Sequence, residues 1–263
     1  MKCKEIMECL EKVSPKMYAE SWDNVGLLVG NEDKEVKKIM IALDASDTVI
    51  AQAVKEKADM LITHHPMLFS AVKKITAGDF IGRKVIELIK ADISYYAMHT
   101  NYDVCYMNEA AADKIGLQDK TVLEPLKLNK EKMAMEGIGR FGTLKEPVTV
   151  AELAERVKKE FSLDTVRITG DKDHKVQKAA ISTGAGKSMV SHALENQVEV
   201  LITGDIDHHT AKDALEQGLQ IIDAGHFGTE HFMTESVKTY LEGHYGEQLE
   251  IVIAQEESPF FII

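Results

Sequence analysis

The chain has 263 residues and a formal net charge of −12, with 44% hydrophobic and 28% charged residues, as in ordinary globular proteins. This length allows one large domain or two ordinary ones. The acidic balance disfavours a nucleic-acid-binding protein, because phosphate contacts require a basic surface. No stretch approaches the roughly 18 apolar residues of a membrane helix, and the first residues, MKCKEIMECLEKV, lack a secretory apolar core. We therefore expect a cytoplasmic protein.

The spacing of the cysteines does not match a disulfide framework or a zinc-binding motif. Cys3, Cys9 and Cys105 are odd in number and widely spaced, and no CxxC pair is present. This usage favours a reduced compartment, without disulfides and without a zinc site built on thiolates. We interpret the three as small, partly buried apolar residues.

Strands alternate with helices along the chain, which predicts an α/β fold. Helices are expected at 3–13, 47–57, 80–91, 108–115, 149–160, 187–196, 210–217 and 229–242. Strands are expected at 38–43, 60–63, 93–98, 121–127, 138–144, 165–169, 177–182, 199–203, 219–223 and 249–254. The segment SWDNVGLLVG (21–30) is expected to be irregular.

The two halves of the chain resemble each other. When residues 38–65 are laid on 178–205, both read as strand, turn, helix and strand. With a different offset, YAMHTNYD (96–103) resembles DAGHFGTE (223–230), and each carries a histidine followed four residues later by a carboxylate. We therefore expect two similar α/β lobes with mixed sheets flanked by helices.

The predicted lobes are 1–128 and 129–263, joined near 128–136. The join is not rich in proline or glycine, so we expect the lobes to pack firmly against each other. The chain passes directly from LEPLK into the second lobe, which leaves no room for an inserted middle domain.

Several histidines directly follow predicted strands, where ligand sites of α/β sheets gather. His64 and His65 are adjacent in LITHHPMLF. Neighbouring residues of an extended chain point to opposite sides, so these two would each hold one of two ions. His226 and Glu230 are four apart, and they would share one face of a helical turn if a helix opens there.

Carboxylates at Glu230 and Asp103 could bridge two such ions. Three imidazoles with two carboxylates form a mixed nitrogen and oxygen donor set, which suits Zn²⁺, Mn²⁺ or Fe²⁺. Two ions of this kind can activate water for hydrolysis. The alternative for any single histidine is an ordinary hydrogen-bonded residue, and this is our interpretation of His174, His192, His231 and His244.

The motifs SWDNVGLLVG, THHP, HTNYD, GDIDHHTAKDA and DAGHFGTE resemble, in this order, those of the NIF-three-like family, also called GTP cyclohydrolase I type 2 homologues. The resemblance covers nearly the whole chain. It implies two α/β lobes with a dinuclear metal site in the cleft between them, and a toroidal homohexamer whose sites face an internal cavity. It implies two divalent ions per chain, held by His64, His65, Asp103, His226 and Glu230.

The resemblance also implies roles outside the ligand set. His99 would act beside the metals, in proton transfer, and Glu230 would be catalytic as well as a ligand. His208 and His209 are candidate substrate contacts. The family name suggests hydrolytic opening of the purine ring of GTP with loss of formate. Hydrolysis of another substrate, such as a phosphoester, remains open, and so does a non-catalytic metal carrier or ring-shaped regulatory protein.

Two further signals carry little function. STGAGKS (182–188) fails the P-loop pattern, because the position of the first glycine holds Ile181, so we interpret it as a structural turn. Trp22, the only tryptophan, is expected to anchor a loop in the core. Asp23 and Asn24 beside it are expected to supply turn chemistry, with a catalytic role as the alternative.

Overall fold

The computed structural model describes residues 1–130 and 133–260, which form two compact units. The first unit consists of residues 1–102 together with 231–263, and the second of residues 103–230. Residues 131–132, inside the predicted join at 128–136, lie outside the described residues. Among the described helices, none is long and apolar enough to cross a bilayer.

The first unit contains a five-stranded mixed sheet. Its strands, in spatial order, are β1 (Gly26–Val29), β4 (Ser94–Ala97), β3 (Met60–Thr63), β2 (Lys38–Ala42) and β11 (Glu250–Ile253). Four strands are parallel, and β1 runs antiparallel to β4 along one edge.

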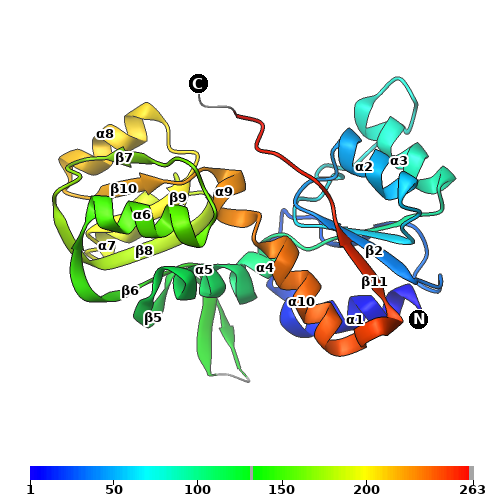
Figure 1. The fold of residues 1–263 in the computed structure, drawn as a ribbon, viewed down its shortest axis with the longest axis horizontal. Helices are drawn as coiled ribbons and strands as arrows, with labels where there is room; N and C mark the ends of the chain where they lie inside the picture. Colours follow the sequence, from blue (N-terminus) through cyan, green and yellow to red (C-terminus); the bar gives the residue numbers. More distant parts are fainter. Residues whose placement is uncertain (131–132, 261–263) are drawn as a thin grey trace. The chain divides into compact units, whose positions relative to one another are not determined.

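Helices cover both faces of this first sheet (Figure 1). They are α2 (Asp47–Lys55) and α3 (Phe80–Lys90) on one face, and α1 (Cys3–Val13) and α10 (Met233–Tyr245) on the other. The apolar residues of α1 recur with the helical period, so they lie on one side of the helix, where they are buried. Helix α10 lies along α1, where the Tyr240 hydroxyl donates to the Cys9 carbonyl at 3.1 Å.

The second unit contains a six-stranded mixed sheet. Its strands, in spatial order, are β5 (Leu117–Asn129), β6 (Ala134–Thr149), β8 (Lys175–Ala185), β9 (Val200–Gly204), β10 (Gln220–Asp223) and β7 (Arg167–Thr169). Its longer helices are α5 (Asn108–Ile115), α6 (Val150–Glu160), α7 (Met189–Glu195) and α8 (His208–Glu216). Apolar residues of α7 and α8 pack on Ala180, Leu201 and Ile221 of the central strands.

The internal repeat is visible in the strand order. In each unit three parallel strands follow one another through helices, β2–α2–β3–α3–β4 in the first and β8–α7–β9–α8–β10 in the second. A short antiparallel strand flanks the last of the three, β1 beside β4 and β7 beside β10. The predicted mixed α/β architecture with two similar sheets is confirmed.

The chain does not divide where the sequence repeat suggested. The predicted boundary at 128/129 falls inside strand β5, which pairs with β6 in the second sheet. The last helix and strand, α10 and β11, belong to the first unit, where β11 pairs in parallel with β2. The described chain passes between the units at Tyr102–Asp103 and at Glu230–His231.

Three local expectations differ from the structure. Part of the segment predicted to be irregular forms strand β1, whose pairing partner β4 is remote in sequence. The helix predicted over 229–242 is two helices, α9 (His226–Glu230) and α10. Helix α8 begins at His208, two residues before the predicted start at 210, because the Asp207 side chain caps the N–H groups of His209 and Thr210.

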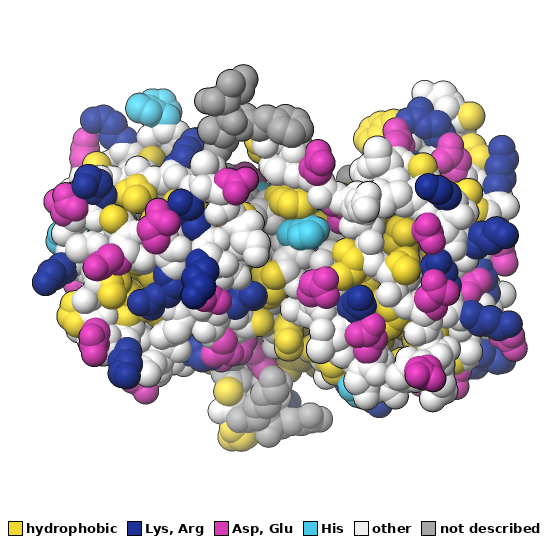
Figure 2. Space-filling model, viewed as in Figure 1, with side chains coloured by type: hydrophobic (Ala, Val, Ile, Leu, Met, Phe, Trp, Pro, Cys, Tyr) yellow, Lys and Arg dark blue, Asp and Glu magenta, His cyan; other side chains and the backbone are white. Residues whose placement is uncertain are grey.

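Cys3, Cys9 and Cys105 form no disulfide, and charged side chains of both signs lie on the surface (Figure 2). On the face of the molecule in Figure 2, basic and acidic side chains are interspersed among the coloured residues.

Candidate metal centre

Three histidines of the first unit lie together at the carboxyl ends of its parallel strands. His64 and His65 directly follow β3, and His99 follows β4. One ring nitrogen of each lies within 4.8 Å of those of the other two. The ring centroids of His64 and His99 are 5.1 Å apart, and those of His65 and His99 are 5.6 Å apart. We call these three residues the histidine cluster.

Each histidine of this cluster has its Nδ1 atom next to an oxygen that can only accept a hydrogen bond. His64 Nδ1 lies 2.9 Å from the Met98 carbonyl, and His65 Nδ1 lies 2.9 Å from Asp44 Oδ1. His99 Nδ1 lies 2.9 Å from Asp23 Oδ1. Carbonyl and carboxylate partners place the proton on Nδ1, so the lone pair is on Nε2. This is the tautomer that metal-binding histidines use, with an oxygen acceptor behind the ring.

The loop that carries His64 and His65 is held by a buried tyrosine. Burial raises the pKa of the Tyr95 hydroxyl to about 12, so the group is protonated at neutral pH. It lies 2.8 Å from Thr63 Oγ1, accepts from the Met67 N–H at 2.8 Å and lies 3.0 Å from the His65 carbonyl. One side chain therefore ties the end of β3 to the backbone on both sides of Pro66.

Asp23 orients His99 in addition to its predicted turn role, in which its Oδ1 accepts from the Asn24 N–H at 2.8 Å. Burial alone would raise the pKa of Asp23, but hydrogen bonds from His99 and Thr100 outweigh it and hold the pKa at about 2. Asp23 Oδ2 accepts from the Thr100 N–H at 3.0 Å and from its hydroxyl. The carboxylate is therefore ionised at neutral pH and fixes the His99 ring from outside the motif HTNYD.

Three predicted ligands of the second unit also lie near one another, and we call Asp103, His226 and Glu230 the carboxylate cluster. Asp103 opens the π-helical turn η2 (Asp103–Met107), which follows the short helix α4 (Thr100–Tyr102) and leads into α5. Such turns occur frequently at functional sites. One carboxylate oxygen of Asp103 lies within 4.8 Å of one of Glu230. His226 and Glu230 share one face of α9, as their spacing predicted.

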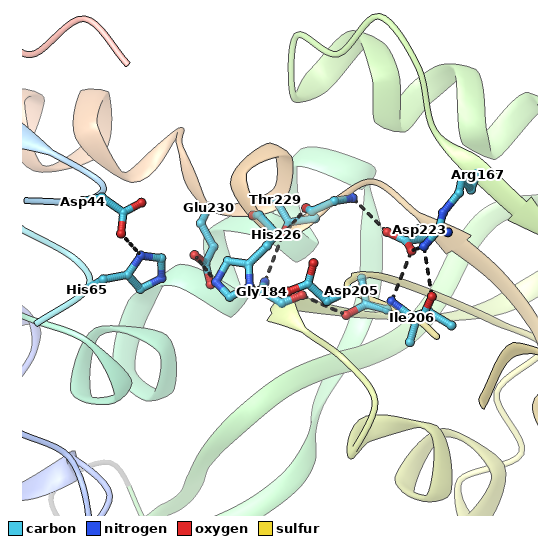
Figure 3. A network of polar contacts seen from close by, with 12 residues as sticks. Asp44, His65, Arg167, Gly184, Asp205, Ile206, Asp223, His226, Thr229 and Glu230 are labelled. Carbon is cyan, nitrogen blue, oxygen red and sulfur yellow. Dashed lines mark hydrogen bonds and ion pairs between the residues drawn. The ribbon is translucent and has the colours of Figure 1, made fainter. Parts of the chain in front are cut away.

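His226 lies between two carboxylates (Figure 3). Its Nδ1 is 2.8 Å from Asp205 Oδ2 and its Nε2 is 3.0 Å from Glu230 Oε2. A neutral imidazole has only one N–H and can donate to only one of the two carboxylates, so the other contact requires a positive charge, either a second proton on the ring or a metal ion. Glu230 is only 3% exposed, where its charge is poorly screened by solvent. The arrangement therefore suits a metal ion between Nε2 and the carboxylate.

The turn in STGAGKS makes room for this carboxylate. Gly184, at the end of β8, has φ +70°, and a Cβ atom there would lie 2.3 Å from Glu230 Oε1. Its N–H donates to Thr229 Oγ1 at 2.9 Å, next to Glu230 in α9 (Figure 3). The interpretation as a structural turn rather than a P-loop agrees with this, but the turn also belongs to the site.

Sequence reasoning missed the residues behind two of the histidines. Asp44 follows β2, and Asp205 follows β9, so both lie at carboxyl ends of parallel strands. That position is the same signal that identified the histidines. The Asp44 N–H donates to Glu256 Oε1 at 3.0 Å, so the segment after β11 supports the backbone of Asp44.

His208 and His209 occupy a different part of the second unit. Both are exposed in the first turn of α8, with ring centroids 5.4 Å apart. Neither joins a group of potential metal ligands among the described residues. Their role as substrate contacts stays a prediction.

Changing Asp205 to asparagine should weaken metal binding about tenfold to a hundredfold, because His226 loses the anion that fixes its tautomer. Asp205 has φ +57°, a conformation that asparagine tolerates, so the backbone should not change. Elemental analysis after equilibration with buffered Zn²⁺ measures the effect. Asp207→Asn is the matched control, because asparagine also caps helices and Asp207 pairs with Lys187. Equal metal affinity in the two variants would contradict the assigned role.

Comparisons with known proteins identify the family and the fold of the chain. A family model described as Duf34/NIF3 (NGG1p interacting factor 3) matches residues 1–259. A Clostridium acetobutylicum protein called GTP cyclohydrolase 1 type 2 homolog is 36% identical, covering 92% of this chain and 90% of its own. Among solved structures, reduced HcgD from Methanocaldococcus jannaschii superposes with a TM-score of 0.83 at 36% identity, covering 96% and 97% of the two chains. The Staphylococcus aureus protein SA1388 superposes with a TM-score of 0.89 at 28% identity, covering 100% and 99%.

Proposed function

The chain belongs to the Duf34/NIF3 family, and from this membership and its two clusters we propose that it is a metal-dependent hydrolase with two divalent ions. His64 and His65 of the histidine cluster would supply one imidazole to each ion. His226 would supply the third imidazole, and the carboxylates of Asp103 and Glu230 would hold both ions. The donor set of nitrogen and oxygen atoms suits Zn²⁺, Mn²⁺ or Fe²⁺.

The position of the carboxylates in the chain supports a site shared by the two units. Asp103 and Glu230 are the first and the last residues of the second unit. Each is therefore covalently joined to a residue of the first unit, which carries the histidine cluster. We propose on this ground that the two clusters act together as one dinuclear centre.

The observation that carries the proposal is the orientation of the imidazoles. His64, His65 and His226 each present Nδ1 to an oxygen acceptor. A histidine ligand binds through a nitrogen lone pair, and an oxygen acceptor beside Nδ1 leaves that lone pair on Nε2. The shared orientation of the three imidazoles, with Nδ1 toward an oxygen acceptor, supports metal binding through Nε2.

The proposed chemistry is attack by an activated water. Two divalent ions at such a centre lower the pKa of a bound water and neutralise the oxyanion that forms in hydrolysis. His99, with its ring fixed by Asp23, accepts the proton released by the water and returns it to the leaving group. Glu230 keeps its carboxylate in the centre throughout the reaction.

GTP is the first substrate to test, because relatives at 36% identity are called GTP cyclohydrolase 1 type 2 homolog. The purified chain is assayed for formate release from GTP, first as apoprotein and then loaded with Zn²⁺, Mn²⁺ or Fe²⁺. We expect metal-dependent formate release that His65→Ala abolishes. If the chain binds two ions but forms no product from GTP, it has no GTP cyclohydrolase activity. Two alternatives would then be favoured: a hydrolase that acts on a phosphoester, and a non-catalytic metal carrier.

The remaining parts of the proposal rest on family membership. We propose a toroidal homohexamer that lines its internal cavity with the metal centres, in the cytoplasm. His208 and His209 at the start of α8 are proposed as substrate contacts. Light scattering on the purified chain tests the assembly, since a monomer would rule out the ring.

A further inference from the structure

The only tryptophan is exposed beside the histidine cluster, which corrects its predicted place in the core. Trp22 is 55% exposed, and Phe69, in the loop after His65, is 52% exposed. The two rings have centroids 5.7 Å apart. The indole also lies edge-on to His99, with centroids 6.1 Å apart. Two large aromatic side chains therefore lie side by side, with Trp22 next to His99, while half of each remains in contact with solvent.

The backbone beneath these rings is fixed. Asp23, the residue after Trp22, is hydrogen bonded to His99 and to Thr100. The Asn24 side chain donates to the Leu68 carbonyl, which joins the loop of Trp22 to the loop of Phe69. The rings are thus held in place by polar contacts of their neighbours, although they gain little burial themselves. An arrangement of this kind is pre-organised to bind a partner.

The size of the exposed surface selects the kind of partner. A fully buried aromatic side chain removes about 150–250 Å² from water, so two half-exposed rings offer far less than the roughly 800 Å² per partner of a stable protein interface. A flat ring has the right size, since it can lie on an aromatic face and exclude water from it. Its place next to His99 also puts such a ring at the proposed centre.

We propose that the flat heteroaromatic ring of the substrate lies on the indole of Trp22, beside His99, and also contacts Phe69, whose ring is tilted 47° from the indole. This inference rests on the proposed function, because it places the ring where the activated water is delivered. Trp22 and Phe69 are then specificity-determining residues, which favour substrates with a planar ring over aliphatic ones. The ligands of the ions have no part in this contact.

The test measures binding rather than turnover. Guanosine is titrated into the full chain by calorimetry, with ribose as the matched probe without a ring. We expect Trp22→Leu to weaken guanosine binding about tenfold or more, Trp22→Phe to retain part of the affinity, and ribose to bind none of the proteins. Phe80→Leu is the control, because Phe80 is an aromatic residue of the same unit that is 60% exposed and contacts Lys84.

Two further readouts separate this inference from the proposed function. Trp22 is the only tryptophan, so guanosine should quench its fluorescence directly, and metal content measured on the same samples should be unchanged in Trp22→Leu. If the chain cannot be loaded with Zn²⁺, Mn²⁺ or Fe²⁺ but binds guanosine in a way that Trp22→Leu weakens, the hydrolase is contradicted and the aromatic surface is supported. The inference is overturned if wild type does not bind guanosine, or if wild type and Trp22→Leu bind it with equal affinity. It is also overturned if the Trp22 fluorescence intensity depends only on protein concentration and does not change as guanosine is added.

Discussion

Glu230→Gln should reduce metal-dependent hydrolysis at least about a hundredfold, because the centre loses a charged ligand that it needs in the transition state. The substitution preserves the shape of a side chain that is 3% exposed. It also replaces the carboxylate oxygen 3.0 Å from His226 Nε2 with a group that can donate to that nitrogen. The apoprotein should therefore fold with unchanged or higher stability, and only the response to metal should be lost.

Thermal unfolding with and without Zn²⁺ measures this separation. A ligand that binds only the folded state raises the unfolding temperature, so wild type should be stabilised by Zn²⁺ and Glu230→Gln should not. Glu216→Gln, at an exposed glutamate near the end of α8 that pairs with Lys212, is the control and should behave as wild type. Hydrolysis that survives in Glu230→Gln would refute the mechanism.

Gly184→Ala should remove metal binding while it destabilises the fold only moderately. The new Cβ atom would lie 2.3 Å from Glu230 Oε1 and 3.4 Å from His226 Nε2. The carboxylate must move, and displacement of a ligand should lower metal affinity at least about tenfold. The backbone conformation at φ +70° adds a cost of about 1–2 kcal/mol for any residue with a Cβ.

Gly218→Ala separates these two effects. Gly218 has φ +88°, and a Cβ there would meet no atom within 4 Å. Both variants should therefore lose a similar unfolding free energy in a denaturant titration, but only Gly184→Ala should lose bound metal in elemental analysis. If both variants bind metal as wild type does, Gly184 has no role in the centre.

The motifs were informative because they lie where parallel strands end. Hydrophobic runs such as Met60–Thr63 are recognisable from local composition, and polar residues that follow them are at the edge where sites form. The same reasoning applied to β2 and β9 would have identified Asp44 and Asp205. It could not reveal their partners, since the acceptors of His65, His64 and His99 lie 21, 34 and 76 positions away in the chain.

The prediction for Trp22 was wrong. Tryptophan is usually well buried, so a single tryptophan in an irregular segment predicts an anchor in the core. Here Asp23 takes the inward position, with its carboxylate on His99 and Thr100. The indole of Trp22 stays 55% exposed while the side chain of Asp23 is buried, and composition alone does not indicate this exchange.

From its residues alone, this chain could be recognised as a repeated α/β protein with histidines and carboxylates at the ends of its strands. Those features depend on short-range periodicity and on side chains next to each strand. Tertiary structure decided that β11 returns to the first sheet, that β1 is a strand at all, and that aspartates hold the imidazoles. These outcomes depend on hydrogen bonds between segments far apart in the chain, which form only when the sheets have assembled.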